Sequence, residues 1–519
     1  MALYTDADET YRNTPLTSSI PPPSATTVPL PNQRGRHGHR APPPPSHYRG
    51  PLRHAPYPTS RSRGLQPPHA YPDTHRHDSR SRTVPAETVL GPREVKTLAF
   101  TALDTSVPAG SWVNFAVLGA ESDFHSDLFY DQDLVDCLAA LQTKLGSAQN
   151  AAEVDQARNL LNPARQLGAG PFASPAAIEL AALDYLCGLT TSKSTHKAFT
   201  FVDLFGDAGG CADYLLWRMH RAHRLVQGWG VQIAENQTIR PESFYSRSVT
   251  ADAFSVYPTP VYMSITSDYS ETGKPLVEFV GRQTGSDDSH RGVDLIVAQA
   301  LGPYDSTAAL RLVWQTTVAL GMLCQGGQFV LKVSTFESPL TIGVAFILHQ
   351  CFQTMAILKP VPLDSDHPER YLVCRGLNAN APRVEQRLQS VLPALAKEAQ
   401  TNPAHTGKFL QIVDQPLLCQ AGAFVDYMQT TNVKLAMSQL KALQQLDKHL
   451  THTQPIVPQH DKVTVCQTCL QVWQLPVPNP NATARQPPSA RSHPRPPPSS
   501  ASRKSDGFLD SLIGQMHQR

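Results

Sequence analysis

Short apolar runs and longer helical patterns alternate along the middle of the chain. The short runs are almost wholly apolar and predict strands, at residues 199–204, 226–233, 293–298, 328–333, 355–358 and 370–374. Between and before them, apolar residues recur at helical spacing, at residues 176–186, 308–323 and 339–352. Strands that alternate with helices predict an α/β fold, with a largely parallel sheet covered by helices on both faces.

Helical patterns also flank this alternating core. Residues 133–161 predict a helix that is interrupted near Gly146, and residues 384–473 predict a mostly helical extension that packs against the sheet. Residues 176–186 predict an amphipathic helix, entered through Ser174 as a cap and Pro175 in the first turn. The closing residues 506–519 suit a short amphipathic segment that docks on a partner or on the body, or a frayed terminus.

Both ends of the chain are too poor in large apolar residues to form a core. Residues 1–92 are dense in Pro, Arg and His, and the stretch after Pro476 is similar, so burial would not offset the entropy of ordering them. We therefore predict a disordered tail (1–92), a sheet domain with a helical lead-in (93–382), a helical extension (383–475), and a Pro-rich linker with a terminal segment (476–519).

Charge and cysteine content narrow the class of protein. The net charge is only +2, but the N-terminal tail is locally basic, which suits RNA binding or nuclear import as well as a merely solvated tail. Nine scattered cysteines favour a reducing compartment. Cys466 and Cys469 form a lone CxxC, interpreted as part of a helix rather than a metal or redox site. No signal peptide or long apolar run is visible, so we expect a protein that is neither secreted nor in a membrane.

A glycine-rich turn carries the most informative chemistry. Residues 201–218 read FVDLFGDAGGCADYLLWR: a strand that ends at Asp203, a turn from Gly206 to Gly210, and then a helix with apolar contacts. Strand, glycine turn and helix is an arrangement that brings backbone close to a small-molecule cofactor. A tight connection with no ligand is the alternative.

Three blocks together resemble a known family. They are this glycine turn, VDLIVAQALG at 293–302, and GGQFVLKVSTFESPLTIGVAFILHQCFQTMAILKP at 326–360 followed by HPERYLVCRGL. In this order and spacing they resemble FtsJ-type RNA 2'-O-methyltransferases, and more closely the eukaryotic mRNA cap enzymes that methylate the ribose of the first transcribed nucleotide. The resemblance runs from about Asn162 to Trp473.

The resemblance implies a Rossmann-like sheet with S-adenosylmethionine at the strand ends, and transfer of its methyl group to a ribose 2'-hydroxyl. Its cofactor positions correspond to Asp203, Gly206, Gly209 and Gly210, and Asp268 matches a further cofactor aspartate. The usual glycine and proline before the double glycine are replaced by Asp207 and Ala208. Asp207 would repel the carboxylate of the cofactor or point to solvent.

The family's Lys-Asp-Lys-Glu tetrad, in which a central lysine has a depressed pKa, is half retained. Lys332 matches the central lysine and Glu369 the glutamate, whereas Glu179 stands for the first lysine and Gln299 for the aspartate. Losing members of such a unit removes most of its rate enhancement. The alternatives without catalysis are a solvent-exposed Lys332 and a salt bridge from Glu369 to Arg370 or Arg375.

Three hypotheses follow. The first is a pseudoenzyme that binds RNA, cap or cofactor, or supports an active partner. The second is an active methyltransferase in which Lys193, Lys197 or another group replaces the missing lysine. The third is a structural subunit that binds no cofactor. Expected partners are capped mRNA or other RNA and, through the tails, an active enzyme of the capping machinery, in the nucleus or otherwise the cytoplasm. The aromatic residues Trp112, Trp229 and Tyr304 are expected to pack in the core or in loops rather than to clamp a cap.

Overall fold

The computed structural model describes residues 97–101, 126–146, 151–191, 198–204, 207–232, 238–246, 249, 252–261, 269–285, 292–300, 306–401, 411–458 and 460–476. All of them lie within the compact unit Arg80–Arg519. The strands are β1 (Leu98–Ala99), β2 (Phe199–Leu204), β3 (Val226–Gly230), β4 (Phe254–Val256), β5 (Val293–Ala300), β6 (Leu323–Val333), β7 (Phe352–Leu358) and β8 (Arg370–Leu377).

The helices come in three groups along the chain. Before β2 lie α2 (Gln132–Gly146), α3 (Ala151–Leu161) and α4 (Ala176–Cys187), with short 3-10 turns η2 (Ser126–Leu128) and η3 (Pro163–Leu167). Between strands lie α5 (Gly210–Arg221), η4 (Pro241–Ser243), α7 (Tyr269–Gln283), α8 (Ser306–Met322) and α9 (Pro339–Cys351). After β8 lie α10 (Ala381–Thr401), α12 (Gln415–Cys419), α13 (Gly422–Leu450) and α14 (Lys462–Val472).

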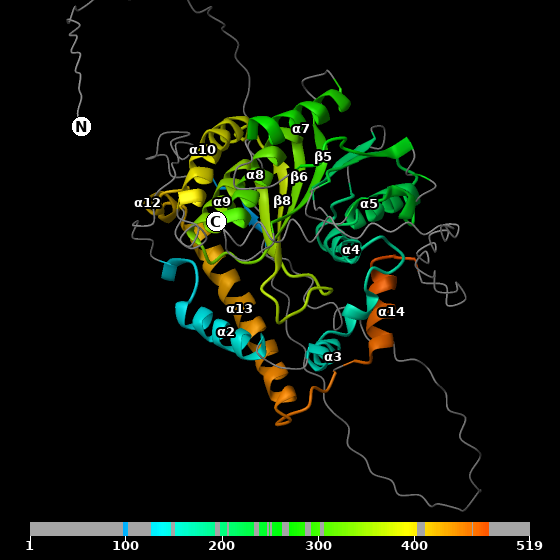
Figure 1. Cartoon of the computed structure of the whole chain (residues 1–519), viewed down its shortest axis with the longest axis vertical. Helices are drawn as coiled ribbons and strands as arrows, with labels where there is room; N and C mark the ends of the chain where they lie inside the picture. Colours follow the sequence, from blue (N-terminus) through cyan, green and yellow to red (C-terminus); the bar gives the residue numbers. More distant parts are fainter. Residues whose placement is uncertain are drawn as a thin grey trace, which may run out of the picture. The chain divides into compact units, whose positions relative to one another are not determined.

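One mixed sheet forms the centre of the fold, with the strand order β1-β7-β8-β6-β5-β2-β3-β4 (Figure 1). Strands β4, β3, β2, β5 and β6 pair in parallel, as the alternating pattern predicted. The prediction of a largely parallel sheet is wrong for the other edge, where β8 runs antiparallel to both β6 and β7, and β1 runs antiparallel to β7. The reason is that a loop without a helix joins β7 to β8, so the chain returns in the opposite direction.

Helices cover both faces of the sheet, as predicted, and two apolar cores result. On one face, strand residues such as Val202, Ile296 and Leu331 pack with side chains from α7, α8, α9, α10 and α13. On the other face, Phe201, Val297 and their neighbours pack with α4, α5 and α14 (Figure 1). The fold is thus a Rossmann-like α/β sheet with a helical extension. Trp229 is buried in the first core, as expected.

Several boundaries differ from the prediction. Strand β3 ends at Gly230, while β5 and β6 are longer than their apolar runs because polar residues continue the ladder. Strands β1 and β4 and helix α7 were not predicted. The interrupted helix before the sheet is confirmed as α2 and α3, and the mostly helical extension as α10 to α14. Trp112, Tyr304 and residues 506–519 lie outside the described residues. No helix in the described part is long and apolar enough to cross a membrane.

Helix α4 corrects two further predictions. It is not amphipathic, because every residue from Ala176 to Asp184 is buried, between the sheet and α5. Pro175 occupies the N-cap position rather than the first turn, and no side chain caps the helix. A charged side chain on a helix that is buried all round costs free energy unless it is paired, and α4 carries Glu179.

Asn432 fastens α13 to the sheet at the exit of β6. Its amide nitrogen donates to the carbonyl oxygens of Phe129 and Phe336, both at 3.1 Å, and its amide oxygen accepts from Arg370, also at 3.1 Å. The side chain is 3% exposed. Three separate segments therefore depend on one buried side chain.

Replacing this side chain tests its role. Asn432→Ala leaves two carbonyls and a guanidinium without their partner, so we expect the free energy of unfolding to fall by about 2–3 kcal/mol in urea denaturation. Ser438→Ala, at an exposed position of the same helix, is the control and should change it by less than about 0.5 kcal/mol. Equal effects of the two substitutions would contradict the assignment.

Candidate active site

Lys332 lies at the centre of the candidate site. It is the second-last residue of β6, flanked in the ladder by Gln299 of β5 and Tyr371 of β8. Its neighbours in β6, Leu331 and Val333, point into the first core. Lys332 therefore points to the opposite face, which α4 covers, and it is only 6% exposed. The alternative of a solvent-exposed lysine at a strand end is wrong.

Two carboxylates hold this lysine. The Lys332 Nζ atom is 2.9 Å from Glu179 Oε2 and 3.1 Å from Glu369 Oε2. The Tyr371 hydroxyl donates to the same Glu179 oxygen at 2.5 Å, and its ring centroid is 5.7 Å from the lysine Nζ. Glu179 thus contacts the retained lysine directly. Glu369 pairs with Lys332, which is the contact expected of a retained site residue.

The electrostatics of Lys332 are the reverse of what the resemblance implies. Burial by itself lowers the pKa of the ammonium, but the carboxylates of Glu179 and Glu369 outweigh it and raise the pKa above its ordinary value. Burial, with Glu179 beside it, also raises the pKa of the Tyr371 hydroxyl well above its ordinary value. A lysine with a raised pKa stays protonated near neutral pH and cannot take a proton from a hydroxyl.

Gln299 of β5 pairs in register with Lys332 of β6. Both side chains therefore emerge on the same face of the sheet. An amide contributes no charge there. The site therefore sets two carboxylates against one ammonium, whereas the family pattern has two lysines and two carboxylates. With Glu179, Gln299, Lys332 and Glu369 together, the site has an excess of negative charge.

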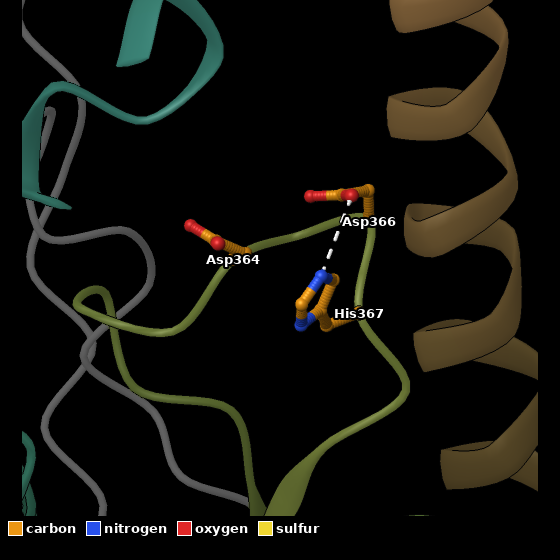
Figure 2. Close-up of side chains that lie close together, drawn as sticks. All are labelled: Asp364, Asp366 and His367. Atoms are coloured by element: carbon orange, nitrogen blue, oxygen red, sulfur yellow. Dashed lines mark ion pairs between the residues drawn. The ribbon is translucent and has the colours of Figure 1, made fainter. Parts of the chain in front are cut away.

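The loop from β7 to β8 positions Glu369 through a network of ion pairs. Arg158 of α3 lies 2.9 Å from Asp366, and Arg165 of η3 lies 2.8 Å from Asp364. Figure 2 shows these two aspartates with His367, whose ring nitrogen is 3.9 Å from Asp366. The three side chains have ligand atoms within 4.8 Å of one another, as in a metal site, but each carboxylate already faces an arginine. We interpret the cluster as an anchor for the loop.

Lys359 begins the same loop, and the sequence did not point to it. Its side chain donates to the carbonyl oxygen of His367. Burial, with Arg370 adding to it, lowers the pKa of Lys359 to about 8, against the opposing effect of Asp366 and Glu369. The lysine with a depressed pKa in this region is therefore Lys359 rather than Lys332. Only burial in the folded loop creates this property.

The glycine turn places two aspartates at the start of α5. Asp203 is the second-last residue of β2, is 1% exposed, and accepts the backbone N–H of Ala212 at 3.0 Å. Asp207 is partly exposed and accepts the N–H of Ala208 at 2.8 Å. Burial and then the charges of Asp203, Asp207 and Glu179 raise the pKa of the Cys211 thiol well above its ordinary value. The beginning of α5 is therefore already occupied by negative charge.

Neighbouring protein atoms leave no room for a Cβ atom at either residue of the double glycine. Gly209 has φ +88°, and a Cβ atom there would lie 2.6 Å from the ring of Phe244, which is fully buried. A Cβ atom on Gly210 would lie 2.0 Å from Ser174 Oγ and 3.1 Å from its carbonyl oxygen. The sequence predicted a close approach of backbone to a cofactor. The described neighbours of these glycines are instead η4 and the entry to α4.

The described turn does not fit the carboxylate end of S-adenosylmethionine. A bound anion needs N–H donors at the helix N-terminus, and the N–H groups of Ala208 and Ala212 already bond protein carboxylates. Like charges from Asp203 and Asp207 would repel a third carboxylate at this place. Gly206, Asp268, Lys193 and Lys197 lie outside the described residues, so their predicted roles stay predictions.

Comparison with known proteins identifies the domain. Residues 176–377 match the family model described as FtsJ-like methyltransferase. This part of the chain is an FtsJ-like methyltransferase domain. It spans α4 to β8, which includes the whole Lys332 cluster.

Curated relatives of this chain carry a more specific name. It is 25% identical over 345 residues to cap-specific mRNA (nucleoside-2'-O-)-methyltransferase 1 of Bos taurus, a match that covers 62% of this chain and 40% of the relative. The corresponding proteins of Homo sapiens and Drosophila melanogaster are 24% and 23% identical, over 62% and 63% of this chain and 40% and 42% of theirs. The match therefore spans about 40% of the length of these curated relatives. A solved ribosomal RNA methyltransferase from Plasmodium falciparum is 17% identical, over 40% of this chain and 98% of that chain, with a TM-score of 0.29.

Removing the ammonium tests the Lys332 cluster. Lys332→Met leaves the buried Glu179 and the partly exposed Glu369 side by side without their cation, and we expect the free energy of unfolding at neutral pH to fall by about 3 kcal/mol. Because the folded pKa of Lys332 is raised, its contribution is fully present below the unfolded pKa and is lost as pH rises through the folded pKa. The difference between wild type and variant should thus shrink above about pH 10.5. Lys434→Met, at an exposed position of α13, is the control. Urea denaturation at pH 7 and pH 11 that shows no such shrinkage would contradict the raised pKa.

Proposed function

We propose that this chain is a degenerate cap 2'-O-methyltransferase that no longer transfers methyl groups and binds capped RNA on behalf of an active partner enzyme. The observation that carries the proposal is the buried ammonium of Lys332, held between Glu179 and Glu369 at 2.9 and 3.1 Å. The relatives are named as cap-specific mRNA methyltransferases, which supports a capped mRNA as the substrate class.

The chemistry of the reaction explains why this geometry opposes catalysis. A ribose 2'-hydroxyl is a weak nucleophile, so a site must align it with the methyl group and assist the loss of its proton. Lys332 is protonated and already paired twice, so it offers neither a base nor an unoccupied donor in the direction of Glu179. Glu179 further adds a negative charge near the place of an anionic RNA backbone, and Gln299 cannot balance the lysine.

S-adenosylmethionine is the methyl donor that the resemblance implies. The carboxylates of Asp203 and Asp207 at the start of α5 support weak or absent binding of this cofactor. Loss of the cofactor does not remove the surfaces that would bind RNA. We therefore assign binding, rather than transfer, as the retained activity.

The partner and location form the finer part of the proposal. The basic, Pro-rich tail (1–92) suits contacts with RNA or with the capping machinery, and a nuclear location follows from that role. We propose the sheet domain (93–382) and the helical extension (383–475) as the RNA-binding body, with the last segment (476–519) as a linker.

Methyl transfer to a capped oligonucleotide tests the loss of catalysis. We expect incorporation by the full chain to equal that of Lys332→Ala, because the paired lysine contributes nothing to turnover. An active cap methyltransferase on the same RNA provides the positive control. Turnover by the wild type that Lys332→Ala abolishes would show that a substitute group, such as one in the segment of Lys193 and Lys197, completes the site, and would overturn the proposal.

Calorimetry separates the binding function from a purely structural one. We expect saturable heat with a capped RNA oligonucleotide and weaker heat with the same RNA lacking the cap. We expect no saturable heat with S-adenosylmethionine up to about 1 mM, a limit that excludes a binding free energy stronger than about 4 kcal/mol. Absence of binding to either RNA would favour the structural scaffold. Tight binding of S-adenosylmethionine would contradict the interpretation of Asp203 and Asp207.

A further inference from the structure

A cavity elsewhere in the molecule shares no residue with the Lys332 cluster. Its volume is about 470 Å³, within the range of small-molecule sites. The end of α3, the last two turns of α13, the connector 454–458 and α14 enclose it. Leu160, Leu161, Ile456 and Val465 give it apolar walls. The FtsJ-like match begins after α3 and ends before α13, so all the lining residues except Val361 of the β7–β8 loop lie outside that match.

The charges that line this cavity are all of one sign. Lys441 and Lys448 of α13 line it, together with His460, and no aspartate or glutamate is among its described lining residues. Both lysines are exposed. Neither forms an ion pair with another described residue. Their ammonium groups are thus available to an anion.

Acidic residues close by in the sequence are already engaged. Asp447, next to Lys448, pairs with Lys144 of α2 at 2.7 Å. Asp461, next to His460, accepts the backbone N–H groups of Val463 and Thr464 and caps α14. Neither carboxylate is therefore left over to neutralise the lysines. The local excess of positive charge remains uncompensated by these neighbours.

Polar side chains complete the lining of the cavity. The Nε2 atom of His460 is buried and has no hydrogen-bond partner among the described residues, which is uncommon for a buried polar atom. Gln445 lies between the two lysines on the same face of α13, and Gln454 adds a second side-chain amide. A ligand with several acceptor oxygens would satisfy these groups.

The spacing of the lysines indicates the kind of anion. They are seven residues apart on one helix, or about 10 Å along its axis, and each ammonium is a point charge on a flexible stem. A single carboxylate would meet one of them, whereas a chain of phosphates reaches both. We propose that this cavity, the α13–α14 pocket, binds the polyphosphate of a nucleotide, with the nucleoside against the apolar walls. The phosphates belong to a free nucleoside triphosphate or to the 5'-triphosphate end of an RNA.

Calorimetry on the full chain tests the pocket with three probes: ATP, adenosine, and a short RNA with a 5'-triphosphate. We expect ATP or the RNA to bind, and adenosine to bind at least tenfold more weakly, because it lacks the phosphates. Binding of both phosphorylated probes indicates recognition of the triphosphate itself. Binding of the RNA alone assigns the pocket to RNA ends, and binding of ATP alone assigns it to free nucleotides.

Substitutions place the binding in the pocket. Lys441→Gln with Lys448→Gln should weaken binding of the phosphorylated probe by about tenfold or more, since two charge-assisted contacts are lost. Lys274→Gln with Lys397→Gln removes the same charge from exposed positions of α7 and α10 and should leave binding within about twofold. Circular dichroism confirms that both variants fold. Failure of both phosphorylated probes to bind, or an equal loss in the two double variants, would overturn the assignment. Because the Lys332 site is untouched, a failure here leaves the proposed function standing.

Discussion

The pairing of a buried ammonium with two carboxylates is the interaction on which the candidate site depends. Lys332 lies between β5 and β8 under α4, where an unpaired charge would cost several kcal/mol. Glu179 and Glu369 offset that cost. The same pairing raises the pKa of the lysine, so that its ammonium stays protonated and cannot act as a base. Stability of the charge and catalysis by it are therefore in conflict at this place.

The architecture brings the partners of Lys332 from two distant parts of the chain, α4 and the start of β8. Strand β8 inserts antiparallel between β6 and β7, which sets Tyr371 beside Lys332 and Glu369 just before the strand. Helix α4 delivers Glu179 from above the same face. The ion pairs of Arg158 and Arg165 hold the loop that carries Glu369. A network in α3 and η3 thus supports a site that neither element touches directly.

At the turn before α5, protein groups likewise occupy the positions that a ligand would use. In a ligand-binding turn, glycines and helix N–H groups face the ligand. Here Phe244 and Ser174 occupy the space beside Gly209 and Gly210, while Asp203 and Asp207 accept two of the N–H groups. A cavity lined by lysines, without acidic residues among its described lining, lies elsewhere, in the α13–α14 pocket. The fold has therefore kept its sheet while the features that invite a ligand lie in the helical extension.

The local pattern of residues by itself determined the strands, most helices and the family resemblance, because apolar periodicity and glycine turns are properties of short segments. It also located Lys332, Glu369, Glu179 and Gln299. It did not determine the antiparallel edge of the sheet, because the direction of β8 depends on which strand it pairs with. Nor did it determine the charge states, since the raised pKa of Lys332 and the lowered pKa of Lys359 arise from burial and from neighbours far away in sequence. Only the tertiary structure decided that Glu179 is a direct partner of Lys332.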